Sequence, residues 1–182
     1  SANKLSRFPN ELYSMRRKSI KFFENNLGDQ FDLFGPKWNR SINRKEKFFP
    51  FLMPKFKSYR GISPDKIETF SHYKFALCYE NAYGLNGYVT EKIFDCFNAR
   101  IVPIYWGAEN ITDYVDKEAF IDRRKFKSDK ELFNFLNSID ENEYNKYLTA
   151  IEKYLTGDNY KLFLSENFSD TIIKTLNLKI NQ

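Results

Sequence analysis

Short apolar runs that alternate with helix-like segments restrict the fold of this chain more than any other feature of its sequence. The runs YKFALCY (residues 73–79) and IVPIYW (residues 101–106) have the length of strands, and a helix-like segment at about residues 90–98 separates them. Two shorter runs, FDLFG (residues 31–35) and AFID (residues 119–122), are also typical of strands. Strands that alternate with helices predict an α/β layer sandwich with a mainly parallel sheet.

Further helices are predicted toward both ends of the chain. Apolar residues recur at roughly helical spacing from Glu11 to about Asn26, and Gly28 follows as a stop signal. The other predicted helices are a short one at residues 65–71, one at NITDYV (residues 110–115), and two or three from Asp129 onward with breaks near residues 138–141 and 157–159.

Prolines limit what two segments can form. Pro50 and Pro54 disfavour a regular helix in residues 36–63, so we predict a long, structured loop there. Its aromatic run FFPFLMPKF (residues 48–56) is expected to pack on the domain, with a membrane surface as the alternative. Pro103 cannot donate a hydrogen bond to a neighbouring strand, so its strand is predicted to be an edge strand or irregular at that point.

The composition is that of one globular domain over residues 1–182. The chain is 42% hydrophobic and 29% charged, and no apolar run approaches the roughly 20 residues of a membrane-spanning helix. Aromatic residues reach 18%, so we expect some apolar surface to meet a ligand, a partner or a further domain. Cys78 and Cys96 lie inside apolar patterns and are interpreted as small core residues rather than as a disulfide or a metal site.

The net charge of +5 favours an anionic ligand, nucleic acid or a negative membrane surface, without choosing among them. The basic stretch RSINRKEKFF (residues 40–49), with Trp38 and Tyr59 near it, offers a surface for nucleic acid or an anionic membrane. A run of charges is more often a solvated face, so these two remain secondary hypotheses.

No metal site is predicted. The chain has no Asp-x-Asp pair of the kind that holds a cation, and the nearest pattern, Asp116 with Glu118, is interpreted as a solvated turn. With His72 as the single histidine, a histidine-based metal site is not expected either. His72 is interpreted as a surface or packing residue.

A glycine-containing loop, NAYGLNGYVTEK (residues 81–92), joins the strand at residues 73–79 to the helix that follows it. In an open α/β sheet, ligands gather at the carboxyl ends of strands, and the first backbone N–H groups of a helix favour an anion. Gly84 and Gly87 allow close approach of the backbone. Lys92 places a positive charge in the first helical turn, which the helix dipole disfavours unless an anion such as phosphate offsets it.

The same junction has a simpler interpretation. Thr90 can cap the helix, Glu91 can act as a partner of its dipole, and Lys92 can remain in water. The alternative role of Glu91 is to accept hydrogen bonds from sugar hydroxyls, because a carboxylate that faces a diphosphate would repel it. The loop is neither a G-x-x-x-x-G-K-[ST] nor a G-x-G-x-x-G motif, so both interpretations stay open.

The order of motifs in this region resembles the donor-binding half of the family 10 fucosyltransferases, the α-1,3/1,4-fucosyltransferases. The resemblance rests on YKFALCYEN, GYVTEKIFDCF, IVPIYWGAENI and AFIDRRKF, and on ELYSMRRKSIKFFENN with FDLFG nearer the start. It implies a GT-B fold, in which two Rossmann-like domains face a cleft and the C-terminal one holds GDP-fucose. It also implies inverting transfer of L-fucose to a hydroxyl of a glycan acceptor, with no required metal or cofactor.

The resemblance further implies a set of site residues. Arg16, with adjacent Arg17 as the alternative, would pair with the diphosphate. Lys92 would contact phosphate, and Glu91 would lie near the ribose or the fucose. The full set is Arg16, Asn81, Tyr88, Glu91 and Lys92 for donor binding, with Glu80 and Thr90 as supports of the loop.

Other parts of such an enzyme are expected outside residues 1–182. In this family the acceptor-binding domain, which supplies the carboxylate base, precedes the donor domain, and the first strand of the donor domain is expected to be missing or trimmed here. No residue of this chain is therefore assigned as the general base, and the isolated chain is expected to be incomplete for catalysis. The alternatives are a non-catalytic module that binds a sugar nucleotide, or a basic domain that binds nucleic acid or a membrane surface.

Composition indicates a compartment. A chain rich in Lys, Asn and Ile is typical of an AT-rich microbial or viral genome, which favours a cytoplasmic enzyme that works at a membrane surface. The Golgi lumen is the alternative if the source is eukaryotic.

Overall fold

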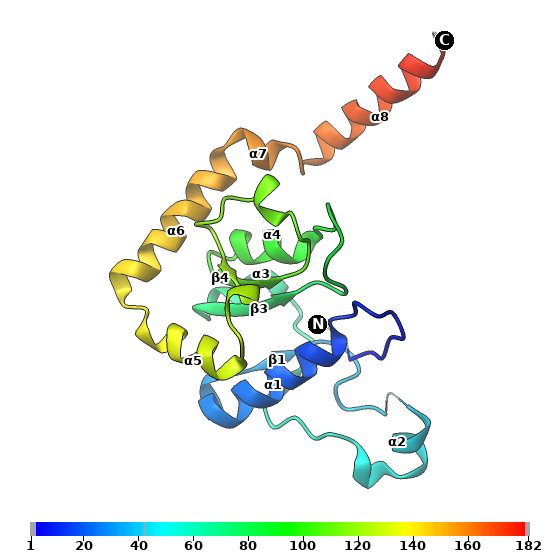
Figure 1. Ribbon diagram of the computed structural model, residues 1–182, viewed down its shortest axis with the longest axis vertical. Helices are drawn as coiled ribbons and strands as arrows, with labels where there is room; N and C mark the ends of the chain where they lie inside the picture. The colour runs from blue at the N-terminus through cyan, green and yellow to red at the C-terminus, as the bar shows by residue number, and fades with distance from the viewer. Residues whose placement is uncertain (1–2, 42, 181–182) are drawn as a thin grey trace.

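Two small parallel sheets form the centre of the structure (Figure 1). The computed structural model describes residues 3–41 and 43–180. One sheet pairs β1 (Leu33–Phe34) with β2 (Tyr59–Gly61), and the other has the order β3 (Phe75–Tyr79), β4 (Val102–Trp106), β5 (Ile121–Asp122). The predicted α/β class with parallel strands is confirmed, whereas the division of the strands between two sheets departs from the single sheet expected.

Pro103 lies in the central strand of its sheet and pairs in regular register, so the prediction of an edge strand or an irregularity there is wrong. β4 pairs with β3 on one side and with β5 on the other, and Pro103 stands opposite Ala76. The N–H of Val102 donates toward β3, to the carbonyl of Lys74, so the nitrogen of the next residue faces the β5 side. β5 pairs with β4 only from Ile104 onward, and the missing donor of Pro103 therefore costs no bond between strands.

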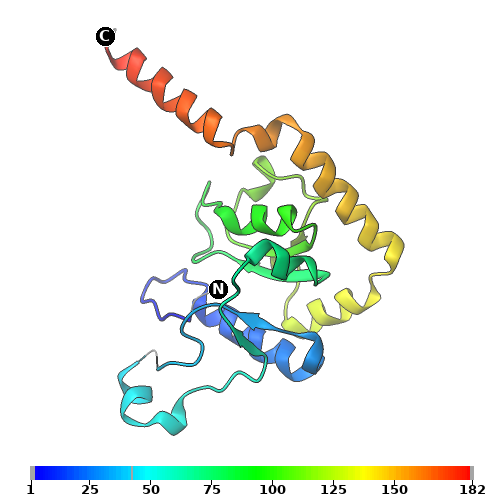
Figure 2. The same cartoon turned by 180° about the vertical axis from the view of Figure 1, so that it is seen from behind.

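Helices cover the sheets in the order that the sequence pattern predicts. α1 (Tyr13–Leu27), α3 (Lys66–Ser71) and α4 (Glu91–Asn98) confirm the helices expected before the last strand. Within the described residues, four helices rather than two or three follow that strand: α5 (Asp129–Ser138), α6 (Glu141–Thr156), α7 (Asp158–Lys161) and α8 (Ser165–Ile180). The stretch NITDYV forms a single turn of 3-10 helix at Ile111–Asp113. α5, α6 and α7 curve around one side of the molecule, and α8 extends away from it (Figure 1, Figure 2).

Most of the core lies around the β3–β5 sheet. Every residue of β4 except Trp106 is buried, as are Ile93 and Phe97 on α4. Cys78 and Cys96 are free thiols inside this core, which confirms their interpretation as small core residues.

The segment at residues 36–63 is more regular than the predicted loop. It contains the short helix α2 (Arg44–Phe48), a 3-10 helix (Pro50–Leu52) and strand β2. The side chain of Asn43 caps α2 by accepting a hydrogen bond from the N–H of Glu46. α2 ends before Pro50, because a proline cannot continue a helix of this kind.

The aromatic side chains of this segment do not pack on the domain as expected. The exposed fractions are 70%, 52% and 79% for Phe48, Phe49 and Phe51. Phe56 differs, because its ring centroid lies 5.0 Å from that of buried Trp38. We call residues 40–57 the aromatic-basic loop.

Candidate functional site

The carboxyl ends of β3 and β4 meet at one edge of their sheet. Tyr79 of β3 pairs with Trp106 of β4, and the N–H of Glu80 donates to the carbonyl of Trp106 at 2.8 Å. We call residues 81–90 the junction loop, since α4 starts directly after them at Glu91. All the predicted site residues except Arg16 belong to this loop, to the residue before it or to the first turn of α4.

Glu80 is a fully buried carboxylate at the centre of the junction. It accepts hydrogen bonds from the N–H of Thr90 at 2.9 Å, from the hydroxyl of Thr90 at 2.8 Å and from Nζ of Lys92 at 2.8 Å. A buried charge is tolerated when it is paired and hydrogen-bonded, and these three donors meet that condition. Glu80 therefore ties the end of β3 to the start of α4.

Thr90 stands at the N-cap position of α4 without capping it through its side chain. Its hydroxyl makes no capping hydrogen bond to the helix and donates to the carboxylate of Glu80 instead. The prediction of a side-chain cap at Thr90 is therefore wrong. The physical reason is that both functions of the hydroxyl are used by charged partners: it donates to the carboxylate of Glu80, and its oxygen accepts from Nζ of Lys92 at 2.7 Å in place of a helix N–H.

Lys92 already has a counter-charge inside the protein. Its Nζ lies 2.8 Å from Oε2 of Glu80, 2.7 Å from Oγ1 of Thr90 and 3.9 Å from Oε1 of Glu91. The place of this lysine in the first turn of α4 consequently needs no phosphate to explain it. An ammonium has three N–H donors, two of them are used here, and the side chain is 22% exposed, which leaves one donor for a ligand.

Arg16 is buried at the carboxyl end of β3. Its Nη2 donates to the carbonyls of Tyr79 at 2.6 Å and of Glu80 at 2.8 Å. Burial lowers the pKa of this guanidinium. Arg17 lies apart from this strand end, with its Nη2 4.0 Å from the carboxylate of Glu46 on α2. Of the two arginines, Arg16 is the one that shares the strand end with Glu80.

Asn81 and Tyr88 connect the two halves of the junction loop. Nδ2 of Asn81 donates to the hydroxyl of Tyr88 at 3.3 Å. Glu91 follows the loop and keeps its side chain 68% exposed. The structure thus brings the predicted donor-binding residues to one strand edge, with Glu91 facing solvent and Arg16 in the interior.

Glycines shape the junction loop and the end of the neighbouring strand β4. A Cβ at Gly107 would lie 2.4 Å from Cγ of Glu80, so a side chain cannot be accommodated there without movement. Gly84 and Gly87 have φ values of 72° and 71°, which glycine adopts at low cost, and the N–H of Gly87 donates to Oδ1 of Asn110 at 2.8 Å. Sequence reasoning gave Gly107 and Asn110 no role. The available signal was that an apolar strand ends in a glycine followed three residues later by an asparagine.

Two arginines at the carboxyl end of β5 also escaped the sequence analysis. Nη2 of buried Arg123 lies 2.9 Å from Oδ1 of Asp129. Nη2 of Arg124 lies 2.8 Å from Oδ2 of Asp122, and this hydrogen-bonded carboxylate raises the pKa of Arg124. Both cations are therefore paired with carboxylates of the protein itself.

Metal ligation and membrane crossing find no support in the described part of the chain. It holds no group of three or more histidine, cysteine, aspartate or glutamate side chains that could bind a metal ion. Asp116 and Glu118 are exposed, and the N–H of Glu118 donates to Oδ1 of Asp116, which confirms the solvated turn. His72 is exposed as well. Over the same residues, no helix has both the length and the apolar character needed to cross a membrane.

Sequence comparison gives the family. Residues 32–169 match the model of glycosyltransferase family 10 (fucosyltransferase) C-term. The match covers most of the chain, and the chain therefore belongs to this family.

Known relatives and solved structures extend well beyond this chain. An alpha-(1,3)-fucosyltransferase FucT of Helicobacter pylori is 34% identical over 106 residues, which are 58% of this chain and 22% of that protein. An alpha-(1,4)-fucosyltransferase of Arabidopsis thaliana is 40% identical over 79 residues, which are 42% of this chain and 20% of that protein. A crystal structure of an alpha1,3-fucosyltransferase with GDP-fucose is 21% identical with a TM-score of 0.46, over 84% of this chain and 56% of that one. The chain thus spans about a fifth of the length of these two relatives.

Proposed function

We propose that this chain is the GDP-fucose-binding domain of an enzyme that transfers L-fucose to a hydroxyl of a glycan acceptor. Family membership supports the class of activity. The observation that carries the proposal is the junction itself, where the motif Tyr-x-Thr-Glu-Lys lies between the end of β3 and the start of α4. Strand ends of this kind, combined with a helix N-terminus, are where open α/β folds bind anionic ligands.

The junction offers cations and hydrogen-bond donors to a nucleoside diphosphate. The remaining N–H of Lys92 and the first backbone N–H groups of α4 would contact the phosphates. The exposed carboxylate of Glu91 would accept hydrogen bonds from ribose or fucose hydroxyls, beside the amide of Asn81 and the hydroxyl of Tyr88. Glu80 acts through Lys92, because it fixes the position of the ammonium.

Arg16 has a second role beside the predicted pairing with the diphosphate. Its Nη2 is used by the carbonyls of Tyr79 and Glu80, so it also holds the end of β3. A guanidinium has five N–H donors, and pairing with a phosphate would use those on its other nitrogens.

In the proposed transfer, the acceptor oxygen attacks the anomeric carbon from the face opposite GDP, and the configuration inverts. The bond between fucose and the diphosphate breaks, the sugar becomes oxocarbenium-like, and the GDP leaving group gains negative charge. Lys92, Arg16 and the N-terminus of α4 would stabilise that charge where it develops. We propose that these groups act without a metal ion.

The general base that deprotonates the acceptor hydroxyl is proposed to lie on an acceptor-binding domain outside residues 1–182, the other half of a GT-B arrangement. On this view the isolated chain binds the donor and does not transfer fucose.

A non-catalytic module that binds a sugar nucleotide is the alternative. Fucose transfer by the full-length parent protein would support the enzyme, and donor binding without transfer would support the module.

Calorimetric titration of the chain with GDP and with GDP-fucose, without divalent metal, tests the donor site. Replacing Lys92 by alanine is expected to weaken binding by about 1–3 kcal/mol, the range for a charged hydrogen bond. Lys153→Ala, at an exposed position of α6, is the matched control and is expected to leave the affinity unchanged. Equal affinity of the Lys92→Ala variant, with a circular dichroism spectrum of a folded chain, would refute a diphosphate site at the junction.

We further propose that the aromatic-basic loop contacts an anionic membrane surface. Exposed basic side chains and exposed aromatic rings lie together on it: Arg44, Lys45, Lys47, Phe48, Phe49 and Phe51. The carboxylate of Glu46, in the same stretch, is buried. Apolar rings that enter the acyl boundary, with cations that meet the headgroups, are typical of an interfacial contact. Nucleic acid is less favoured, because buried Trp38 is not available to stack on a base.

Sedimentation with vesicles tests this contact and the location that goes with it. The chain is expected to bind vesicles of phosphatidylglycerol and phosphatidylcholine, to bind less at high salt, and to lose binding in a Phe49→Ser, Phe51→Ser double variant. Leu5→Ser, which removes a 55% exposed apolar side chain outside the loop, is the control. Unchanged binding of the double variant would exclude the loop as the contact.

Because the proposed contact is with an anionic membrane surface, we propose that the enzyme is cytoplasmic and works at that surface. The Golgi lumen is the alternative for a eukaryotic source.

A further inference from the structure

A buried polar cluster joins α1, β3 and α5. It consists of Ser19, Tyr79, Arg123 and Asp129, which we call the polar tetrad. Oγ of Ser19 lies 3.1 Å from the hydroxyl of Tyr79 and 2.9 Å from Oδ1 of Asp129. The same carboxylate oxygen accepts a hydrogen bond from Nη2 of Arg123 at 2.9 Å. Ser19, Tyr79 and Arg123 are buried, and none of the four side chains belongs to the proposed donor-binding set.

The hydroxyl protons of the polar tetrad have one consistent arrangement. A carboxylate that is paired with a guanidinium only accepts hydrogen bonds, so Ser19 gives its single hydroxyl proton to Asp129. The hydroxyl of Tyr79 must then donate to Oγ of Ser19. Burial raises the pKa of Tyr79 to about 12, so this hydroxyl keeps its proton at neutral pH. The donors thus run in one direction, from Tyr79 through Ser19 to Asp129.

Elsewhere α1 and α5 pack through apolar rings. The ring centroid of Phe133 lies 6.4 Å from that of Phe23 and 6.1 Å from that of Phe22. Apolar contacts of this kind have no preferred direction, whereas a satisfied polar network fixes the orientation of the groups that it joins. The polar tetrad therefore sets how α1 is oriented against β3 and α5.

Tyr79 is bound to α1 through both its side chain and its backbone. Its hydroxyl contacts Ser19, and its carbonyl accepts from Nη2 of Arg16 at 2.6 Å. Arg16 and Ser19 are three residues apart, so they lie on one face of the helix. A rotation of α1 about its axis would break both contacts. The position of the Arg16 guanidinium is therefore linked to the anchoring of the Tyr79 side chain.

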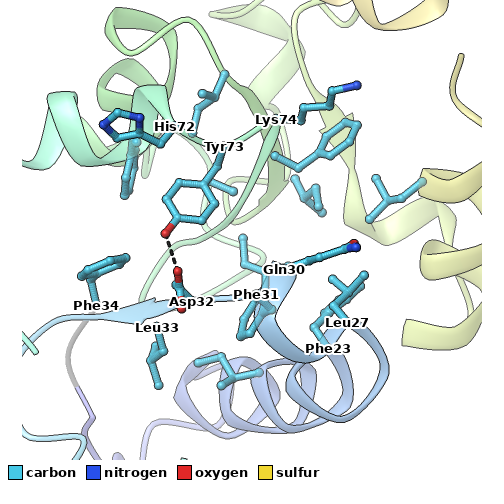
Figure 3. A pocket seen from close by; sticks show the side chains of 18 of the residues that line it. Phe23, Leu27, Gln30, Phe31, Asp32, Leu33, Phe34, His72, Tyr73 and Lys74 are labelled. Atoms are coloured by element: carbon cyan, nitrogen blue, oxygen red, sulfur yellow. Dashed lines mark hydrogen bonds between the residues drawn. The ribbon is translucent and has the colours of Figure 1, made fainter. Parts of the chain in front are cut away.

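The later part of α1 faces an apolar groove. The groove has a volume of about 630 Å³, and Phe23 and Leu27 of α1 line one side of it (Figure 3). The hydrogen bond from the hydroxyl of Tyr73 to Oδ2 of Asp32, at 2.6 Å, does not involve α1 (Figure 3). The hydrogen bonds that orient α1 against β3 thus come from the earlier part of the helix, where Arg16 lies.

We propose that the polar tetrad positions the guanidinium of Arg16 for the diphosphate of the donor, an inference that rests on the proposed function. Nη2 of Arg16 is held by the carbonyls of Tyr79 and Glu80, so the donors on its other nitrogens keep a fixed direction. A cation that is oriented before the ligand arrives loses less entropy on binding. Tyr79 is in this sense a positioning residue, which acts through Arg16 and does not touch the ligand.

Tyr79→Phe tests the proposal, because it removes one hydroxyl and keeps the ring. The affinity for GDP, measured by calorimetry, is expected to fall about three- to tenfold, the effect of one lost hydrogen bond. Tyr154→Phe is the matched control on α6, since Tyr154 is also buried and its hydroxyl donates to the carbonyl of Tyr114 at 3.0 Å. The control is expected to lose a similar amount of stability in urea unfolding and to keep its affinity for GDP.

A double-mutant cycle separates positioning from general damage to the fold. Arg16→Gln removes the cation and keeps an amide donor for the strand carbonyls. In this background, Tyr79→Phe is expected to cause no further loss of GDP affinity. In a Lys92→Ala background the full loss is expected to remain, because Lys92 is held by Glu80 and not by the polar tetrad.

Three outcomes would overturn the proposal: an unchanged GDP affinity in Tyr79→Phe, an equal loss of affinity in Tyr154→Phe, or an undiminished effect of Tyr79→Phe in the Arg16→Gln background. Failure of the donor site itself has a different signature. Lys92→Ala and Arg16→Gln would then bind GDP no more weakly than the unmodified chain, and the positioning role would fall with the site.

Discussion

The junction loop and the aromatic-basic loop each follow a parallel strand, yet they are built in opposite ways. The junction loop closes around the buried carboxylate of Glu80, which holds both Thr90 and Lys92. The aromatic-basic loop turns the rings of Phe48, Phe49 and Phe51 toward solvent. A loop organised by an internal charge keeps a defined shape for a small ligand, whereas a loop with an apolar tip suits an extended surface.

The aromatic-basic loop is nevertheless anchored at its base. Glu24 of α1 accepts hydrogen bonds from the N–H and from the hydroxyl of Ser58, both at 2.8 Å. Nζ of Lys21 contacts the same carboxylate at 2.8 Å and also donates to the carbonyl of Lys55. The two loops therefore differ in where their polar contacts lie, at the centre of one and at the base of the other.

Of the changes that test this comparison, replacing Glu80 by alanine is expected to lower the free energy of unfolding the most. Removing one partner of a buried ion pair costs about 3–5 kcal/mol, and the partial exposure of Lys92 places the expected loss near the lower end. Urea unfolding measures the loss. Glu91→Ala, at a 68% exposed neighbour, is the control and should change the free energy of unfolding by less than about 0.5 kcal/mol. A loss below about 1 kcal/mol for Glu80→Ala would remove the distinction between the loops.

Acid is expected to lower the free energy of unfolding by an intermediate amount, through the contacts at the base of the aromatic-basic loop. Burial acts to raise the pKa of Glu24, but hydrogen bonds from Lys21 and Ser58 outweigh it and leave this pKa lowered. A carboxyl group of this kind contributes stability above the ordinary carboxyl range, about pH 4, and that stability is lost as the pH falls through the lower pKa of the folded state. Urea unfolding at pH 7 and pH 3 should therefore show a smaller acid-induced loss in Glu24→Gln than in the unmodified chain. Equal losses would contradict this role.

Replacing Phe51 by serine is expected to have the smallest effect on stability. Its ring is 79% exposed, so the free energy of unfolding should change by less than about 0.5 kcal/mol. Phe56→Ser is the matched control within the same loop, and it should cost more because that ring packs on Trp38. Thermal denaturation compares the two. A larger loss for Phe51→Ser than for Phe56→Ser would mean that the tip packs on the domain in solution.

The β3–β5 sheet could be predicted from the sequence, whereas β2 could not. β3 and β4 are apolar runs of strand length separated by an amphipathic helix, which is the pattern of a buried parallel sheet. β2 consists of Tyr59–Gly61 with an exposed arginine between its ends, too short and too polar for any periodicity to appear. The prediction of an edge strand or an irregularity at Pro103 failed because the length of β5, which decides whether a donor is missed, is not visible in the run IVPIYW.

In the candidate site, too, the sequence did not predict which side chains contact one another. Local helix rules assign Thr90 to the helix end and set Lys92 against the dipole, and each rule considers only nearby residues. The partner that both side chains use is Glu80, which comes from the end of the preceding strand. A motif can thus mark where a site lies, while the ion pair that organises it depends on how strand and helix pack.

The buried thiols of the core make the motion of this layer measurable. Burial and then the hydrogen bond with Cys96 raise the pKa of the Cys78 thiol well above its ordinary value. The thiolate is the species that reacts with alkylating reagents, so Cys78 is inert while β3 and α4 remain packed together. Each alkylation event therefore requires that this layer open. When the reagent reacts faster than the layer closes, the labelling rate equals the opening rate, and the measurement needs neither nucleotide nor lipid.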